Sequence, residues 1–495
     1  MTHSYNLLEQ HIAKINKIGS ASCGLHWDLT QNTPDGAKEN MSEDIGNLSA
    51  IAHEMFTSKK TEDLIAAAET EKLDDWQSAN LHLIKKSYIS ATALSTEFVE
   101  AFSILTSKSQ SVWQKAKISS DWDTFSPYLT DIVKSVQEMA QIKSDKLGVK
   151  PYEALLDEYD QGRTVQEIES VFGMLKKELP DLIKQIIEKQ KSEKVLPITN
   201  LIDPKLQKEI SLKIMKKMQF DFSNGRLDEY EHPFCITTSG GVRILSKFLP
   251  DDFLHGIMGT IHETGHALYE QNLPRKYKNQ PVGKACGMSV HESQSLFMEL
   301  QVARSQGFSH YLSKIFIDDF GFKGNEYAHE NLYRLLNRVE PIFIRVNSDE
   351  VTYPLHVILR FELEKALLDG SVKVSEIPKI WNEKMQEYLG IAPSDHKNGC
   401  MQDVHWSSGG FGYFPCYIGG SINASMLAKT AKEKGLMSDA DLVKGDFSNV
   451  SSFLRENIWS KGSCFNPSAV VENTTGEKNL SPEIFLGYLK EKFLV

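Results

Sequence analysis

Cysteine is scarce in this chain, with six in 495 residues. The six stand singly, and no C-x-x-C pair or dense cysteine framework brings two of them together in the sequence. A disulfide scaffold or a cysteine-rich zinc cluster needs such spacings, so we expect reduced thiols. Cys400 and Cys416 flank His405, but neither lies in the sequence neighbourhood of a known cysteine-protease nucleophile, which argues against that class of enzyme.

The chain also lacks a long apolar run and an excess of basic residues. No stretch is long enough to span a bilayer, and residues 1–15 are amphipathic and carry Glu9 where a signal peptide would have an apolar core. The formal net charge is −11, and no cluster of Lys and Arg stands out against it. We therefore expect a cytoplasmic protein that binds neither nucleic acid nor membrane.

No internal repeat, low-complexity tract or obvious linker divides the sequence. Hydrophobic residues make up 41% and charged residues 24%, which is ordinary for a globular protein. A chain of this length allows two or three domains or one large helical body. A single α-rich domain over 1–495 is the simplest interpretation, with a mainly helical part, 1–220, before a metal- and substrate-binding part, 221–495.

The stretch Gly259–Glu270 contains the signature H-E-x-x-H, from His262 to His266. Apolar residues recur through it at three- and four-residue spacing, which predicts a helix. On a helix the two histidines lie one turn apart on one face, and Glu263 projects beside them. Two such imidazoles can hold two corners of a tetrahedral zinc site, while the carboxylate can take a proton from water.

Gly265 stands inside this predicted helix, where glycine costs about 1 kcal/mol relative to alanine. A close approach to substrate or to another helix would explain it. The alternative to a metal site is a chance match of a short motif in a chain with 15 histidines.

A metal site of this kind needs a third protein ligand. The stretch Gly287–Leu300 predicts another helix, and Glu292, 26 residues beyond His266, could return alongside the first helix. Glu299 lies two turns further and competes for the role, but an undistorted helix would carry it about 10 Å along the axis. We expect Glu292 to be the ligand and Glu299 to orient a ligand imidazole.

The region 221–249 breaks the helical rhythm just before the metal helix. Its Pro and Gly residues and the β-rich run Val242–Leu245 predict a short hairpin or small sheet. In zinc peptidases a strand beside such a helix commonly holds extended substrate by backbone pairing.

Earlier in the chain the periodicity is helical, with a predicted turn over His26–Gly36, where Pro, Asp and Gly gather. A capped loop that packs Trp27 is the ordinary interpretation, and ligation by His26 or Asp28 is the alternative. Further on, Thr164 is a predicted N-cap that begins a long charged helix.

Downstream, Glu340–Glu350 is predicted to be helical. A surface salt bridge is the ordinary interpretation of Arg345 and Asp349 at four-residue spacing, and a role for Arg345 in substrate binding is the alternative. A loop over Gly399–Gly420 then leads into a helix. It concentrates His, Asp, Trp and Tyr among glycines, a composition more typical of a functional site than of a packed core.

Several motifs in a fixed order resemble those of the carboxypeptidase Taq family of metallocarboxypeptidases, over nearly the whole chain. The matching stretches are His232–Phe234 for H-P-F, His262–His266 for H-E-x-x-H, His291–Gln294 for H-E-S-Q, Gly399–Trp406 for G-x-x-Q-D-x-H-W, and the less sharply defined Tyr152–Thr164.

Two motifs depart from the family pattern. The family's D-x-R-x-T stands here as Gly241–Leu245 and keeps only Arg243, and I-R-x-x-A-D has Ser348 in place of Ala. The loss of Asp and Thr affects the expected orientation of Arg243 and the substrate preference, but not the metal site.

The resemblance implies a mostly helical, saddle-shaped body with the metal at the floor of a deep groove, of which 1–220 would form one wall. Members of the family are usually homodimers. They remove residues from peptides with a free C-terminal carboxylate, with broad specificity and avoidance of proline, and they use zinc or cobalt.

The expected chemistry is metal-assisted hydrolysis. One divalent metal per chain, zinc before cobalt, would sit on His262, His266 and Glu292, and Glu263 would be the general base.

The remaining candidates act on the substrate. His405 and Tyr413 are expected to stabilise the tetrahedral oxyanion, and Arg345 or Arg243 to bind the free carboxylate. Further candidates for substrate binding are His232, Gln402, Asp403 and Tyr417.

Two alternatives remain open. The first is an endopeptidase or dipeptidase with the same metal chemistry, and the second is a non-catalytic helical scaffold that binds peptides. The scaffold would be marked by loss of Glu263 or of a ligand, and the sequence retains all of them.

Overall fold

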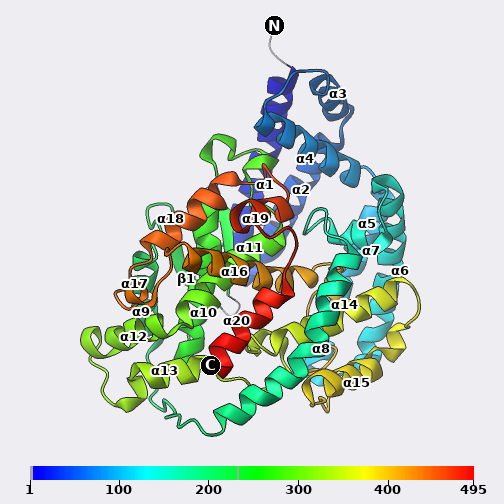
Figure 1. Ribbon diagram of the computed structural model, residues 1–495. Coiled ribbons are helices and arrows are strands. Elements are labelled where there is room, and N and C mark those ends of the chain that lie inside the picture. The colour runs from blue at the N-terminus through cyan, green and yellow to red at the C-terminus, as the bar shows by residue number, and fades with distance from the viewer. Residues whose placement is uncertain (1–3, 231–232) are drawn as a thin grey trace. The chain divides into compact units, whose positions relative to one another are not determined.

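The protein is described by a computed structural model that covers residues 4–230 and 233–495. It is mainly helical with one small sheet (Figure 1), which confirms the predicted fold class. The chain forms two compact units, each assembled from three segments. Unit 1 comprises Met1–Tyr88, Val195–Leu336 and Asn423–Lys478, and unit 2 comprises Ile89–Lys194, Asn337–Ile422 and Asn479–Val495. The division expected near residue 220 falls inside unit 1, and the saddle shape stays a prediction.

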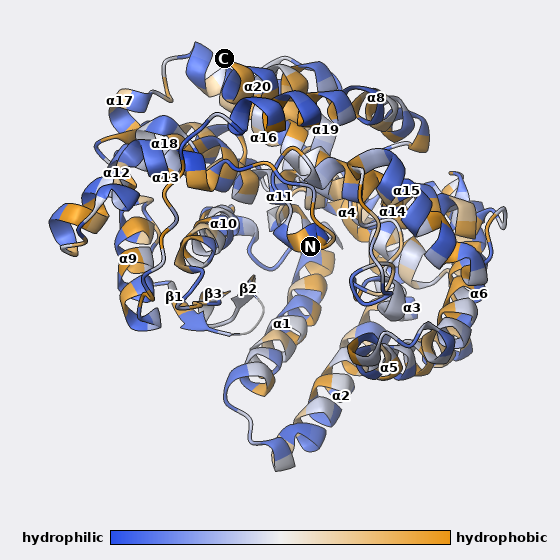
Figure 2. Cartoon of the chain, turned by 90° about the horizontal axis from the view of Figure 1, so that it is seen from below, coloured by the Kyte–Doolittle hydropathy of each residue, from blue (hydrophilic) through white to orange (hydrophobic). Residues whose placement is uncertain are grey.

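The N-terminal helices of unit 1 surround a small apolar core. They are α1 (Ser4–Gln31), α2 (Lys38–Thr57), α3 (Lys59–Ala68) and α4 (Asp75–Ala91), the last of which ends in unit 2. Leu8, Ile12 and Ile15 follow one face of α1 at helical spacing and pack with Ile65 of α3 and Ile84 of α4. Helix α2 packs along α1 with no fully buried residue, and hydrophilic and hydrophobic residues mix along both (Figure 2).

The turn predicted over His26–Gly36 begins later than expected. Helix α1 continues through Trp27 to Gln31, and the carbonyl of Asp28, in its last turn, accepts from the backbone N–H groups of Asn32 and Thr33. Trp27 is buried and packs edge-on against Phe234. Burial of this large ring favours one more turn of helix α1. The predicted turn over His26–Gly36 was therefore wrong as far as Gln31.

A three-stranded sheet precedes the metal-site helix, as predicted. Its strands are β1 (Gly225–Glu229), β2 (Phe234–Thr238) and β3 (Gly241–Ser246), in the order β1-β3-β2. β2 and β3 form an antiparallel hairpin, whereas β1 pairs with β3 in parallel. The central strand β3 buries Val242, Ile244 and Leu245 and packs on the next helix.

That helix, α10 (Phe253–Gln271), is the centre of unit 1. It contacts α9 (Pro204–Lys217), β3 and α11 (Met288–Leu296), and most of its residues are buried. A π-helical segment, η4 (Phe297–Ala303), continues α11. Unit 1 is completed by α12 (Gln306–Lys314), α13 (His329–Leu336), the end of α16 (Pro415–Glu433), α17 (Asp439–Leu442), α18 (Ser448–Asn457) and α19 (Pro467–Thr475).

Unit 2 contains long helices and one irregular stretch. Its helices are α5 (Thr96–Ser119), α6 (Trp122–Leu147), α7 (Pro151–Leu156), α8 (Val165–Gln190), α14 (Tyr353–Leu368), α15 (Ile377–Leu389), the start of α16, and α20 (Pro482–Leu494). The Thr164 hydroxyl accepts from the N–H of Glu167, which confirms the predicted N-cap of α8.

The predicted helix over Glu340–Glu350 is wrong, because the segment forms only a 3-10 turn, Arg345–Asn347. Pro341 cannot donate a backbone hydrogen bond there. Asp349 accepts instead from the N–H groups of Glu340, Val351 and Thr352, which competes with a helical backbone. Arg345 is buried and bonds elsewhere, so the predicted surface salt bridge to Asp349 is wrong as well.

All six cysteines are free thiols, as the sequence predicts. Over the described ranges, every helix is too short or too polar to cross a membrane.

At Gly265 the backbones of α10 and α11 lie close together. A Cβ at this position would lie 2.5 Å from the carbonyl oxygen of Gln294 and 2.6 Å from Cα of Ser295. Both are backbone atoms of α11, which cannot move aside without moving the helix. This confirms that Gly265 permits close contact with another helix.

We expect Gly265→Ala to destabilise the protein by about 1–3 kcal/mol, because the added methyl group overpacks the contact between the two helices. Gly259→Ala on the same helix is the matched control, since nothing lies within 4 Å of its added Cβ. The control should hold or raise the melting temperature through better helix propensity. Equal changes in the melting temperature of the two variants would contradict this account.

Candidate metal centre

Three side chains from two helices converge in unit 1. His262 and His266 come from α10 and Glu292 comes from α11, and one ligand atom of each lies within 4.8 Å of the others. Nε2 of His266 is 3.3 Å from Oε2 of Glu292, and Nε2 of His262 is 4.0 Å from Oε1. In the part of the chain that the structure describes, this is the one group of its kind that could share a metal ion.

The other ring nitrogen of His262 is held by Glu299. Oε2 of Glu299 lies 2.9 Å from Nδ1 of His262, and Oε1 accepts from the Arg304 guanidinium at 2.7 Å. A hydrogen bond at Nδ1 fixes the orientation of the ring and leaves Nε2 for a metal.

The π-helical segment η4 explains how Glu299 reaches this position. Glu299 would lie about 10 Å beyond Glu292 along an undistorted α-helix. The helix changes to π-helical geometry at Phe297, so Glu299 lies within the altered segment and contacts His262, while Glu292 contacts His266. Single turns of π-helix are frequent at functional sites.

His291, the first residue of the H-E-S-Q stretch, packs against His266. The ring of His291 stacks on that of His266 with centroids 4.4 Å apart, and Nε2 of His291 lies 3.2 Å from Oε1 of Glu270. Glu270 also accepts from the Thr237 hydroxyl on β2. His291 and Glu270 therefore support the ring of His266 and connect it to the sheet.

The pKa values of the two histidines shift in opposite directions. Burial alone would lower the pKa of His262, but the bond to Glu299 and the charge of Glu292 raise it to about 10. Burial and the charge of His291 lower the pKa of His266 to about 4.

Both carboxylates remain ionised. Burial would raise the pKa of Glu292 and of Glu299, but the histidines hold the pKa of Glu292 at about 2, and Arg304 with His262 holds that of Glu299 at about 2. The negative charge of Glu292 thus faces Nε2 of both imidazoles, which favours a cation there, while that of Glu299 faces Nδ1 of His262.

Glu263 follows His262 on α10 and is buried. Burial raises the pKa of its carboxyl to about 7, although the charge of His262 opposes the rise. A carboxyl with a pKa near neutrality can both accept and return a proton.

The donor set fits a divalent metal ion. Two imidazole nitrogens and one carboxylate are the usual protein ligands of a catalytic zinc, which keeps a further position open. Nδ1 of His262 is already bonded to a carboxylate, an arrangement common around metal-bound histidines.

Arg243 lies on β3 in the altered motif. Its guanidinium lies 5.0 Å from the centroid of the Trp27 ring, and its buried Nε has no hydrogen-bond partner among the described residues. Gly241, where the family has Asp, adopts a φ of +102°, and an added Cβ would lie 2.4 Å from the carbonyl oxygen of Asn224. The backbone here therefore excludes the family's Asp. His232 lies outside the described residues.

A second cluster, in unit 2, is organised by Asp403. Arg345 donates from Nε and NH2 to Oδ1 of Asp403 at 3.1 and 2.9 Å, and Arg360 donates from Nε to Oδ2 at 2.7 Å. NH1 of Arg345 also donates to the Tyr353 hydroxyl at 2.7 Å. Burial would raise the pKa of Asp403, but the two arginines lower it far below its usual range.

The other predicted residues of unit 2 gather around Arg345. The Gln402 side chain accepts from the backbone N–H of Arg345 at 2.8 Å, and the guanidinium lies 4.9 Å from the centroid of the Tyr417 ring. The ring centroids of His405 and Tyr413 are 5.7 Å apart. Burial lowers the pKa of His405 to about 4, opposed by the charge of Asp403.

Sequence reasoning missed three residues that contact the predicted ones. Arg304 and Arg360 are single arginines without a motif, so nothing in the sequence marked them. Glu270 had a signal, since it follows His266 by one helical turn within the same stretch.

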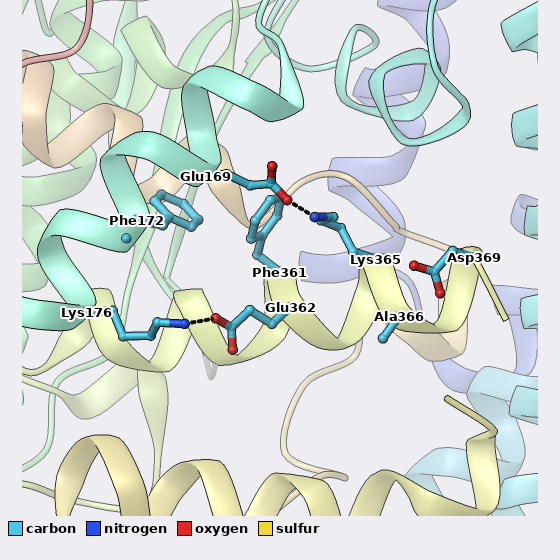
Figure 3. A pocket seen from close by; sticks show the side chains of 9 residues that line it. Glu169, Phe172, Lys176, Phe361, Glu362, Lys365, Ala366 and Asp369 are labelled. Carbon is cyan, nitrogen blue, oxygen red and sulfur yellow. Dashed lines mark hydrogen bonds and ion pairs between the residues drawn. The ribbon is translucent and has the colours of Figure 1, made fainter. Parts of the chain in front are cut away.

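A separate pocket of about 390 Å³ lies in unit 2 between α8 and α14 (Figure 3). Phe172 and Phe361 form part of its wall, and Lys176 pairs with Glu362 across it at 2.6 Å. None of the predicted site residues lines this pocket, and it carries no metal-ligand set.

Comparison with known proteins gives a consistent result. The model of the carboxypeptidase Taq (M32) metallopeptidase family matches residues 7–493. Among curated proteins, carboxypeptidase 1 of Bacillus subtilis is 34% identical over 487 residues, which covers 97% of this chain and 96% of that protein. The thermostable carboxypeptidase 1 of Thermus thermophilus is 33% identical over 502 residues, covering 99% and 98%.

Solved structures are similar over the same length. The Trypanosoma cruzi metallocarboxypeptidase 1 aligns with a TM-score of 0.96 at 36% identity, covering 99% of each chain. A Pyrococcus furiosus carboxypeptidase aligns with a TM-score of 0.95 at 30% identity, covering 100% of this chain and 99% of that one.

Proposed function

This chain belongs to the carboxypeptidase Taq (M32) family of metallopeptidases and is a carboxypeptidase, and from that premise we propose how its residues carry out the hydrolysis. In this proposal one divalent metal binds to His262, His266 and Glu292, and Glu263 is the general base. The observation that carries it is the convergence of these three ligands, with Glu299 bonded to the far side of one imidazole.

Zinc is the proposed metal and cobalt the alternative, because two imidazoles and a carboxylate suit either ion. When bound, the metal would lower the pKa of a water molecule and polarise the scissile carbonyl. Glu299 would keep Nε2 of His262 directed at the ion, and His291 would do the same for His266 through ring stacking.

Glu263 would take the proton from the attacking water and return it to the departing amine. Its position next to His262 and the rise of its pKa to about 7 both support this role. A carboxylate with an ordinary pKa would be a weaker base at neutral pH and a poorer proton donor in the second step.

Arg345 is the proposed partner of the substrate's free carboxylate. A guanidinium has five N–H groups, and three of them donate to Asp403 and Tyr353. The remaining donors lie on a side chain held rigidly in place, which suits bidentate binding of a carboxylate. Arg243 is the alternative, because its buried Nε has no partner within 4–230 and 233–495.

The other predicted residues of unit 2 are proposed either to position Arg345 or to donate hydrogen bonds to the oxyanion. Gln402 and Asp403 bond to Arg345, and Tyr417 stacks beside it, so we propose that these three position it. His405 and Tyr413 are proposed as donors to the oxyanion because of their place in the aromatic loop and by analogy with helical gluzincins.

The partners follow from this chemistry. Peptides with a free C-terminal carboxylate are the proposed substrates, with broad specificity for the residue removed. The homodimer and the cytoplasmic location stay predictions.

The alternative is an endopeptidase or dipeptidase that uses the same metal. Blocking the C-terminus or the N-terminus of a peptide substrate distinguishes these activities from that of a carboxypeptidase. We expect a C-terminally amidated peptide to be cleaved with a kcat/KM roughly 10- to 100-fold below that of the free acid, because a charge-assisted hydrogen bond is lost. Acetylation of the N-terminus of a longer peptide should leave kcat/KM unchanged. Equal cleavage of acid and amide would favour an endopeptidase, and loss of activity on acetylation would favour a dipeptidase.

Glu263→Gln keeps the size of the side chain but removes the proton acceptor. We expect kcat to fall by roughly 10²- to 10⁴-fold while the metal content stays at the wild-type level. His266→Ala is the comparison, and it should lose the metal together with the activity. Full activity in the Gln variant would show that another group is the base.

Glu292 and Glu299 should differ in their effect on metal affinity. Glu292→Ala removes a ligand and is expected to abolish binding, whereas Glu299→Ala removes the orienting bond to His262 and the bond from Arg304 but no ligand, and should weaken binding by roughly 10- to 100-fold. Competition with a metallochromic chelator measures both. The reverse order of affinities would exchange the two roles.

A further inference from the structure

Glu364 is a completely buried carboxylate in α14, and it accepts three hydrogen bonds. Its Oε1 accepts from the indole N–H of Trp406 at 2.9 Å. Its Oε2 accepts from the Tyr152 hydroxyl at 2.7 Å and from the backbone N–H of Gly412 at 3.0 Å. One side chain thus joins α14, α7 and both ends of the loop Trp406–Gly412.

The two loop donors adjoin the two residues proposed to stabilise the oxyanion. Trp406 directly follows His405, and Gly412 directly precedes Tyr413. The bonds to Glu364 therefore fix the backbone next to each of these side chains.

Gly412 is held tightly from its other side. It adopts a φ of +86°, and a Cβ at this position would lie 2.9 Å from the backbone nitrogen of Leu156 on α7. This end of the loop is therefore held between α7 and α14, and only a glycine fits there.

Trp406 is held as firmly. Its indole is buried, lies perpendicular to the ring of Trp381 with centroids 6.1 Å apart, and stacks with Phe411 at 6.2 Å. The N–H of such a ring needs an acceptor once it leaves water, and Glu364 supplies it.

Placing a carboxylate in this buried space has an unfavourable desolvation free energy. Burial raises the pKa of Glu364 to about 7, although the bonds from Gly412, Tyr152 and Trp406 oppose the rise. An apolar side chain of similar volume would avoid the cost of desolvation. It could not, however, accept from three donors on separate segments, which two carboxylate oxygens can do.

We propose that Glu364 is a positioning residue for the hydrolysis: its carboxylate fixes the loop Trp406–Gly412 so that His405 and Tyr413 are held in one arrangement. This inference rests on the proposed role of His405 and Tyr413. It assigns to Glu364 no contact with the substrate or the metal.

The test is a double-mutant cycle on the metal-loaded enzyme with a peptide substrate. Glu364→Gln keeps one acceptor oxygen but turns an amide donor toward a donor of the loop. We expect kcat to fall roughly tenfold, KM to change by less than about threefold, and the metal content to stay unchanged, since only oxyanion stabilisation is weakened.

The second half of the cycle places Glu364→Gln in a His405→Gln, Tyr413→Phe background. There we expect no further fall in kcat, because residues that act as a unit are not additive. An additive fall, or an unchanged kcat in the single variant, would overturn the inference. If the His405→Gln, Tyr413→Phe variant kept the wild-type kcat, the proposed role of His405 and Tyr413 would itself be refuted.

Two further variants keep the test decisive. Tyr152→Phe replaces Glu364→Gln in the test if the latter folds poorly. It removes one of the three bonds and retains the ring, so we expect a smaller fall in kcat with the same non-additivity.

Glu362→Gln is the matched control on α14, because its carboxylate bonds to Lys176 and Tyr388 and not to the loop. An equal fall in kcat in this control would reduce the effect to a loss of charge on α14 and overturn the inference.

Discussion

The close contact of α10 with α11 at Gly265 is the constraint on which the candidate metal centre depends. With any larger residue the two backbones would separate, and Glu292 on α11 could no longer lie 3.3 Å from Nε2 of His266 on α10. The π-helical segment that continues α11 adds the second carboxylate, because it brings Glu299 to the opposite nitrogen of His262. These two features of the backbone bring Glu292 and Glu299 to the two histidines of the motif and so form the candidate three-ligand site with an oriented imidazole.

Carboxylates that accept from several donors recur in this protein; Glu364 is buried, and Glu299 and Asp403 are partly buried. Glu299 joins a histidine to an arginine, Asp403 holds two arginines, and Glu364 joins two helices to a loop. Each is surrounded by enough donors to offset the cost of its burial. A buried polar network of this kind tolerates few alternative arrangements, so the side chains attached to it are held in a single geometry. Arg345 owes its fixed position to such a network.

The sequence predicted the helix of the metal site, its glycine contact and the small sheet, because each depends on local periodicity or on glycine itself. It could not predict the π-helical segment, since nearly all residues of that segment are buried, and a stretch buried on all sides has no one-sided apolar spacing that an extra residue in a turn could shift. The interpretation of Arg345 as a surface residue failed for a related reason: helical spacing to Asp349 is visible in the sequence, whereas the partner Asp403 lies 58 residues away. Similarly, the burial of Trp27 extended α1 beyond its turn signals.

The central claim is that the metal is held by the imidazoles of His262 and His266 with Glu292, and that Glu299 binds only to an imidazole. The most direct measurement is an anomalous-difference map from crystals of the zinc-loaded protein, collected on both sides of the zinc absorption edge. The account predicts one peak per chain, bounded by Nε2 of His262, Nε2 of His266 and the carboxylate of Glu292, with Glu299 still bonded to Nδ1 of His262. A peak coordinated by Glu299 in place of Glu292, or a peak at other residues, would contradict it.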